Sequence, residues 1–185
     1  MGITIHFKGK LNSLGLTTPF LEEVEDIAKS MEWDYTVFPE SNDEKPTPKG
    51  LFIQPHPDSE FLQFMVDKKG HLRNAVILEH FEENKDSTYY NSIKTQFAPI
   101  ETHIAVIKLL KYLKQKYISN LQVWDEGDYW QTGDAKVLYE KFDFLNKKLN
   151  EFESILNSIE IKKNDTAQSV ADKIEQVLKR RWRNK

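Results

Sequence analysis

Apolar and polar residues alternate over Ile3–Phe7, which is the period of a strand with one buried face. Further segments rich in strand-forming residues are Trp33–Val37, Leu51–His56, Phe61–Asp67, Leu72–Phe81 and Leu121–Trp124. Asp67–Gly70 predicts a hairpin turn with Gly70 in the left-handed conformation. Thr88–Tyr90 is a weaker candidate for a short edge strand.

Four segments show helical periodicity instead. Pro19–Met31 and Pro99–Tyr117 each carry one apolar face, and a proline stands where a helix tolerates the missing N–H group. Asp134–Ile159 predicts a long helix with an apolar heptad seam. The seam consists of Leu138, Phe142, Leu145, Leu149, Phe152, Leu156 and Ile159. Asp165 and Gln168 have the spacing of a capping box before a last helix.

The order of these elements predicts an α+β fold. Sequential strands joined by short turns favour a curved antiparallel sheet of five to six strands backed by two helices, with a C-terminal helical hairpin. The layout is similar to TATA-binding-protein-like or helix-grip folds, and that analogy implies no function. We expect a sheet region at 1–132, with the long and terminal helices of 133–185 packed together within one domain. The proline-rich segment Pro39–Lys49 is expected to be a loop.

Composition narrows the classes of function. The chain has 185 residues, a net charge of −3 and no cysteine, which excludes disulfides, cysteine-ligated metals and thiol catalysis. No cofactor is predicted. No segment approaches the ~20 apolar residues needed to span a bilayer, so we expect a cytoplasmic protein without membrane association. The acidic balance makes nucleic acid an unfavoured partner, and the helical seam offers a surface for a homodimer or a partner helix.

An acidic and aromatic turn is the first candidate site. Its residues are Trp124, Asp125, Glu126, Asp128, Tyr129 and Trp130. Aromatic faces beside carboxylates suit cationic ligands or basic peptides. The alternative is a loop whose aromatic side chains pack against the sheet while its acids face water. The leading hypothesis is therefore a small binding or interaction module that recognises a small or peptide ligand through this turn.

A second candidate set consists of His56, Asp58, Glu101 and His103. These side chains could serve a metal-assisted hydrolase, although they form no established metal-ligand spacing. His56 and Asp58 also fit a turn between strands, because prolines flank the histidine. His103 falls on the apolar half of its helix, so a buried histidine hydrogen-bonded to a backbone carbonyl is the alternative. Glu101 in the first turn also suits the helix dipole.

The basic tail Lys179–Lys185 is a third candidate, for phosphate or RNA. Its charges also complement a helix C-terminus, which is the favoured interpretation. The chain has no glycine-rich phosphate loop, no Gly-x-Ser-x-Gly elbow and no His-Glu-x-x-His motif, so whether it is an enzyme stays open.

Several segments resemble landmarks of a family of small uncharacterised bacterial proteins of unknown function. The segments are Pro55–Glu60, Lys94–Ala98, Glu101–His103 and Asp125–Thr132. The likeness covers roughly Gly50–Leu145 of this chain. It implies a bacterial cytosolic protein and no particular activity.

Overall fold

The computed structural model describes residues 2–38, 49–80, 86–162 and 164–183. The chain divides into two compact units, Met1–Tyr139 and Glu140–Lys185, and the boundary falls inside the long helix α5. Each unit is described by itself. Among the described residues, no helix has the length and apolar character needed to cross a membrane.

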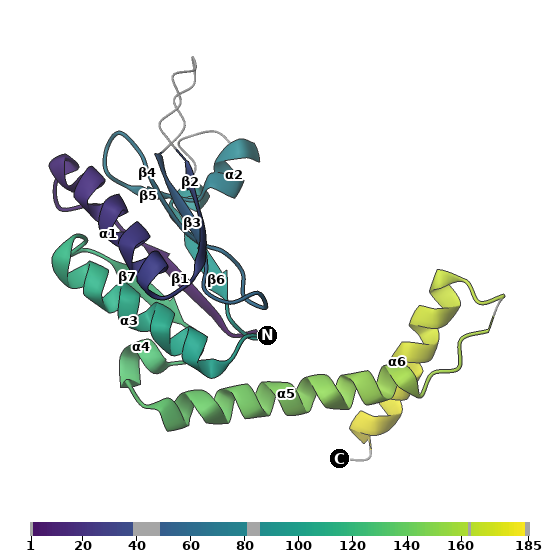
Figure 1. Cartoon of the computed structure of the whole chain (residues 1–185). Helices are drawn as coiled ribbons and strands as arrows, with labels where there is room; N and C mark the ends of the chain where they lie inside the picture. Colours follow the sequence, from purple (N-terminus) through teal and green to yellow (C-terminus); the bar gives the residue numbers. More distant parts are fainter. Residues whose placement is uncertain (1, 39–48, 81–85, 163, 184–185) are drawn as a thin grey trace. The chain divides into compact units, whose positions relative to one another are not determined.

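The first unit contains all the strands of the described chain (Figure 1). They are β1 (Thr4–Lys8), β2 (Asp34–Phe38), β3 (Lys49–Gln54), β4 (Leu62–Val66), β5 (Leu72–Arg73), β6 (Asn91–Lys94) and β7 (Gln122–Asp125). The helices are α1 (Thr17–Ser30), α2 (Ala75–His80), α3 (Ile100–Lys116) and α4 (Tyr129–Thr132), with 3-10 turns at Leu14–Leu16 and Asp86–Tyr89. The predicted α+β class with antiparallel strands is confirmed.

The prediction of a single curved sheet is wrong. The strands form two antiparallel sheets, one of three strands in the order β6-β1-β7 and one of four in the order β2-β3-β4-β5. An isolated bridge between Lys10 and His71 lies where β1 leaves one sheet and β5 begins the other. The sheets stay separate because β5 is short. The side chain of Asn74 accepts a hydrogen bond from the N–H of Ile77 at 3.2 Å, so α2 begins directly after β5 ends at Arg73. Two residues are too few to continue a ladder into the next sheet.

Three local predictions concern residues 67–90. Leu72–Phe81 is not one strand, because α2 takes up most of it. The suggested edge strand at Thr88–Tyr90 is wrong: a 3-10 turn stands there, and the unpredicted strand β6 follows it. The turn at Asp67–Gly70 is confirmed, with Gly70 at φ +82°. The expected loop Pro39–Lys49 lies outside the described residues except for Lys49, which begins β3.

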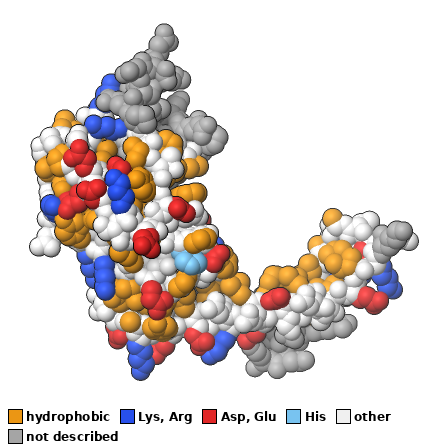
Figure 2. All heavy atoms as spheres, viewed as in Figure 1, with side chains coloured by type: hydrophobic (Ala, Val, Ile, Leu, Met, Phe, Trp, Pro, Cys, Tyr) orange, Lys and Arg blue, Asp and Glu red, His pale blue; other side chains and the backbone are white. Residues whose placement is uncertain are grey.

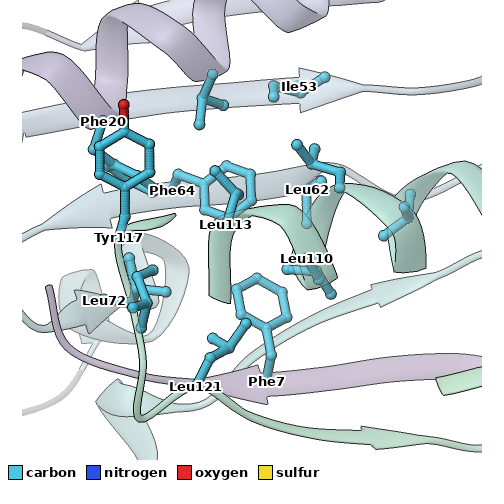
Figure 3. Packing of buried hydrophobic residues seen from close by; sticks show 14 of the residues in the cluster. Phe7, Phe20, Ile53, Leu62, Phe64, Leu72, Leu110, Leu113, Tyr117 and Leu121 are labelled. Atoms are coloured by element: carbon cyan, nitrogen blue, oxygen red, sulfur yellow. The ribbon is translucent and has the colours of Figure 1, made fainter. Parts of the chain in front are cut away.

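Helices α1 and α3 pack on the sheets and enclose the core with them (Figures 1 and 3). Phe64 of β4 lies at its centre, with its ring centroid 5.9 Å from that of Phe7 on β1 and 5.7 Å from that of Phe20 on α1. Leu110 and Leu113 of α3 are fully buried in the same cluster. The two sheets and two helices therefore share one apolar core.

Glu23 joins α1 to α3 at the surface. Its carboxylate accepts hydrogen bonds from Tyr112 and Tyr117 and lies 2.6 Å from the ammonium of Lys116. Burial alone would raise the pKa of Glu23, but the bonds from Lys116, Tyr112 and Tyr117 outweigh it and lower the pKa from 4.5 to about 2. The carboxylate form is therefore the one that the fold stabilises.

This lowered pKa predicts an acid-sensitive link between the helices. Because the folded value lies below the unfolded one, the stabilisation is complete above about pH 4.5 and is lost as the pH falls towards 2. We expect Glu23→Gln to lower the urea midpoint at pH 7, and the difference from wild type to shrink steadily between pH 5 and pH 2.5. Glu22→Gln, on the exposed side of α1, is the control and should show neither effect. A difference that does not change with pH would contradict the assignment.

The second unit is helical. It contains the C-terminal part of α5 (Ala135–Asn157) and α6 (Ala167–Arg183), and hydrophobic side chains lie at its surface (Figure 2). Three seam residues of α5, Leu149, Phe152 and Leu156, are exposed, so the homodimer through 134–159 stays a prediction. The cap of α6 differs from the expected one: Thr166, and not Asp165, accepts the N–H of Ser169 at 3.2 Å.

Candidate functional site

One face of the three-stranded sheet carries polar and aromatic side chains. Ile5 and Phe7 point into the core, so by alternation Thr4, His6 and Lys8 point to the opposite side. His6 lies between Ser92 of β6 and Trp124 of β7 in the strand register. We call this surface the open face; it consists of Thr4, His6, Lys8, Ser92, Lys94, Gln122 and Trp124.

Trp124 and Tyr90 form an exposed aromatic pair at the edge of the open face. Their ring centroids are 5.9 Å apart and the ring planes are inclined by 36°. The ammonium of Lys8 lies 4.5 Å from the centroid of Tyr90 and 5.6 Å from that of Trp124, and it donates a hydrogen bond to the Tyr90 hydroxyl at 2.9 Å. Trp124 is 45% exposed and Tyr90 is 41% exposed, which leaves ring surface available to a ligand.

A cleft of about 380 Å³ adjoins this pair. Besides Gly9 and Tyr90, its walls are formed by Lys8, Lys10, His71, Tyr89, Asn120 and Gln122. We call it the basic cleft, because lysine and histidine are the ionisable groups that line it together with two tyrosines. The bridge between Lys10 and His71 places the cleft where the two sheets meet.

The wall around His71 is held by a charged cluster. Its Nδ1 lies 3.5 Å from Oδ2 of Asp67, and its ring meets Tyr89 edge-on with centroids 5.2 Å apart. The guanidinium of Arg73 lies 4.2 Å from the Tyr89 centroid and donates to Asp67 at 3.0 Å. Burial would raise the pKa of Asp67, but the bonds from the N–H groups of His71 and Lys69 and from Arg73 lower it below its ordinary value.

In the predicted acidic aromatic turn, Asp125 is buried and serves the fold. Its Oδ1 accepts the N–H of Gly127 at 2.7 Å, and its Oδ2 accepts the N–H of Trp130 at 2.8 Å. Burial would raise the pKa of Asp125, but the contact with His103 and these two N–H groups lower it below the ordinary value. The carboxylate thus holds the turn between β7 and α4 in place.

His103 connects three elements inside the core. Its Nδ1 lies 2.8 Å from the hydroxyl of Thr95, directly after β6, and its Nε2 lies 3.1 Å from Oδ1 of Asp125 on β7. All three side chains are buried, so no substrate reaches them. The expected burial of His103 is confirmed, and Thr95 and Asp125 are two of its partners. A Cβ atom on Gly127 would stand 2.9 Å from Nε2, so the close packing here requires glycine.

The remaining residues of the turn divide between packing and surface. Tyr129 and Trp130 pack against the core, and the ammonium of Lys111 lies 5.8 Å and 5.6 Å from their ring centroids. Lys111 therefore already places a positive charge near these two rings, where a cationic ligand would bind. Of the candidate set, Trp124 and Glu126 are exposed and Asp128 is half-buried. That the six residues form a ligand site stays a prediction.

The second candidate set is dispersed. Nδ1 of His56 accepts the N–H of Asp58 at 3.1 Å in an exposed turn between β3 and β4. Glu101 is exposed in the first turn of α3 and accepts the hydroxyl of Tyr139 at 3.2 Å, whereas His103 is buried. Within the described part of the chain, no three His, Asp or Glu side chains are grouped so that they could hold a metal ion. The geometry gives the hydrolase hypothesis no common pocket.

Sequence reasoning passed over most of the basic cleft. Lys8, Lys10 and His71 belong to unrelated segments, and a bridge that depends on the fold brings them together. Tyr89 and Tyr90 gave a weak signal, as two adjacent aromatics in a polar stretch. The basic tail Lys179–Lys185 lies largely outside the residues whose side chains are described.

Comparison of the chain with protein-family models, with curated proteins and with solved structures finds no significant match. The resemblance to small bacterial proteins therefore stays a prediction, and the site has to be judged from its own geometry.

Proposed function

We propose that this chain is a binding module whose ligand lies against Trp124 on the open face. The observation that carries the proposal is the exposed aromatic pair of Trp124 and Tyr90 beside the basic cleft. Large aromatic side chains contribute most to stability when they are buried. A pair that stays exposed while β7 and Lys8 hold it in place therefore indicates a binding surface. A cleft of about 380 Å³ is within the range of small-molecule sites.

The ligand-contacting residues are Trp124, Glu126 and Asp128 from the acidic aromatic turn. Lys8 and Tyr90 complete the surface. Asp125, Tyr129 and Trp130 support the ligand surface from behind through the turn and the core. No part of this proposal requires bond-breaking chemistry. The ligand is small or is a short peptide segment that presents a flat or apolar group to the two rings.

Removal of the indole tests the proposal. A library of small metabolites and short peptides is screened by calorimetry against the full chain, and each hit is measured again with Trp124→Ala. We expect at least one hit whose Kd rises tenfold or more in the variant, because ring contact is lost. Phe61→Ala removes an aromatic ring of comparable exposure at the residue before β4, and the Kd of this variant should stay within twofold of wild type. If the library contains no hit, or if every hit binds Trp124→Ala with an unchanged Kd, the proposal is overturned.

A further inference from the structure

We propose that the ligand is a nucleoside phosphate, with its base against Trp124 and Tyr90 and its phosphate between Lys8 and Lys10. This inference rests on the proposed binding function and names the ligand class of the same site. It follows from three features of the cleft: its charge, the placement of Lys8 on the aromatic pair, and its neutral polar residues.

The charge of the cleft favours an anion. Among the described residues, no aspartate or glutamate lines it, and neither Lys8 nor Lys10 lies in an ion pair with a carboxylate. Other lysines of the chain do have such partners, as Lys116 has Glu23 at 2.6 Å. Arg73, behind the wall, is compensated by Asp67 at 3.0 Å. Two ammonium groups that line one hollow and have no carboxylate partner in the described part of the chain attract a phosphate.

The aromatic pair selects against a cation. The ammonium of Lys8 already lies 4.5 Å from the centroid of Tyr90, so a positively charged ligand at the same rings would meet a like charge. A nucleobase is flat and uncharged at neutral pH, and it stacks on tryptophan and tyrosine. Lys8 touches both rings and also lines the cleft, which places the ring contact and the anion contact within one ligand.

The lining of the cleft also supplies amide groups. The Oδ1 of Asn120 accepts the backbone N–H of Lys10 at 3.0 Å, so the Asn120 side chain is fixed with its NH₂ group still able to donate. Gln122 is exposed beside it on β7 and lines the same cleft. Amides of this kind recognise base edges or ribose hydroxyls. The ligand would thus find charge and directional hydrogen bonds in the cleft of about 380 Å³, and stacking on the aromatic pair at its edge.

The test uses calorimetric titration of the full chain with adenosine monophosphate, adenosine, inorganic phosphate and a six-nucleotide single strand. We expect adenosine monophosphate to bind at least tenfold more tightly than adenosine or phosphate alone. Lys8→Gln and, separately, Lys10→Gln should weaken it tenfold or more and remove the advantage over adenosine. Lys108→Gln on the exposed side of α3 changes the net charge equally and should leave the Kd within twofold. Circular dichroism confirms that each variant is folded.

The outcomes separate the inference from the proposed function. A single strand that binds more tightly per site than the mononucleotide identifies nucleic acid as the source of the nucleotide, and equal affinity identifies the free nucleotide. No binding of any nucleotide at millimolar concentration, or binding that Lys8→Gln and Lys10→Gln leave unchanged, overturns the inference. If a non-nucleotide ligand is nevertheless lost in Trp124→Ala, the binding module stands and only its ligand class is wrong.

Discussion

Asp125→Ala is expected to lower the free energy of unfolding by about 3–5 kcal/mol, because three buried groups lose their acceptor and each such loss costs about 1–3 kcal/mol. The substitution removes the acceptor of the Gly127 and Trp130 N–H groups, at 2.7 Å and 2.8 Å. It also leaves Nε2 of His103 beside an apolar methyl group instead of a carboxylate. Small domains are stable by only about 5–15 kcal/mol, so much of the total would be lost. Urea denaturation followed by circular dichroism measures the change.

Two variants define what the carboxylate contributes. Asp125→Asn keeps the volume and one acceptor oxygen, so only one of the two N–H groups loses its acceptor, and we expect a loss smaller than that of alanine. Asp58→Ala removes an exposed carboxylate and should change the free energy by less than about 0.5 kcal/mol. An Asp125→Ala protein within 1 kcal/mol of wild type would show that the contacts of Asp125 do not hold the end of β7.

The longer helices α1, α3, α5 and α6 could be predicted because their signals are local. Pro99–Tyr117 shows an apolar face and a proline at its start, and the structure places α3 at Ile100–Lys116 with His103 buried. The turn at Asp67–Gly70 was likewise readable from a glycine that adopts positive φ. Such features depend on neighbours in the sequence, so no knowledge of distant contacts is needed.

The elements between residues 72 and 94 could not be predicted from local sequence signals. An apolar run such as Leu72–Phe81 suits a strand or a short helix, and the deciding signal was the capping amide of Asn74. Strand β6 could not be predicted because three of its four residues are polar: Ser92 and Lys94 face outward, while Asn91 is buried with Ile93. Its pairing with β1 joins residues more than eighty positions apart in the sequence.

The candidate site follows the same division. Trp124 could be singled out from the sequence, as one member of a cluster of aromatics and acids. The roles of its neighbours could not, because Asp125 is turned inward by alternation along β7 and meets His103 only after β7 has paired with β1. Lys8 reaches Trp124 through that same pairing. A turn that suggests a cation site in sequence therefore lies beside a lysine that, among the described residues, has no carboxylate partner.

Phe64→Ala is the second substitution with a large expected effect, about 3–5 kcal/mol for a fully buried phenylalanine. Its ring contacts Phe7 of the three-stranded sheet and Phe20 of α1, while β4 itself belongs to the four-stranded sheet. The cavity would therefore weaken both sheets together. We expect circular dichroism, which follows the backbone, and tryptophan fluorescence to give coincident urea transitions, both moved to lower urea.

Phe97→Ala is the matched control, because that ring is 63% exposed and its main contact is the ammonium of Lys94 at 5.6 Å. It should lower the free energy of unfolding by less than about 1 kcal/mol. If Phe64→Ala separated the two transitions, the sheets would have independent cores. The open face would then stay folded after the four-stranded sheet unfolds. The basic cleft would be lost first, because it needs both His71, next to β5, and Lys8 of β1. A shared core predicts instead that the cleft and the aromatic pair disappear in one step.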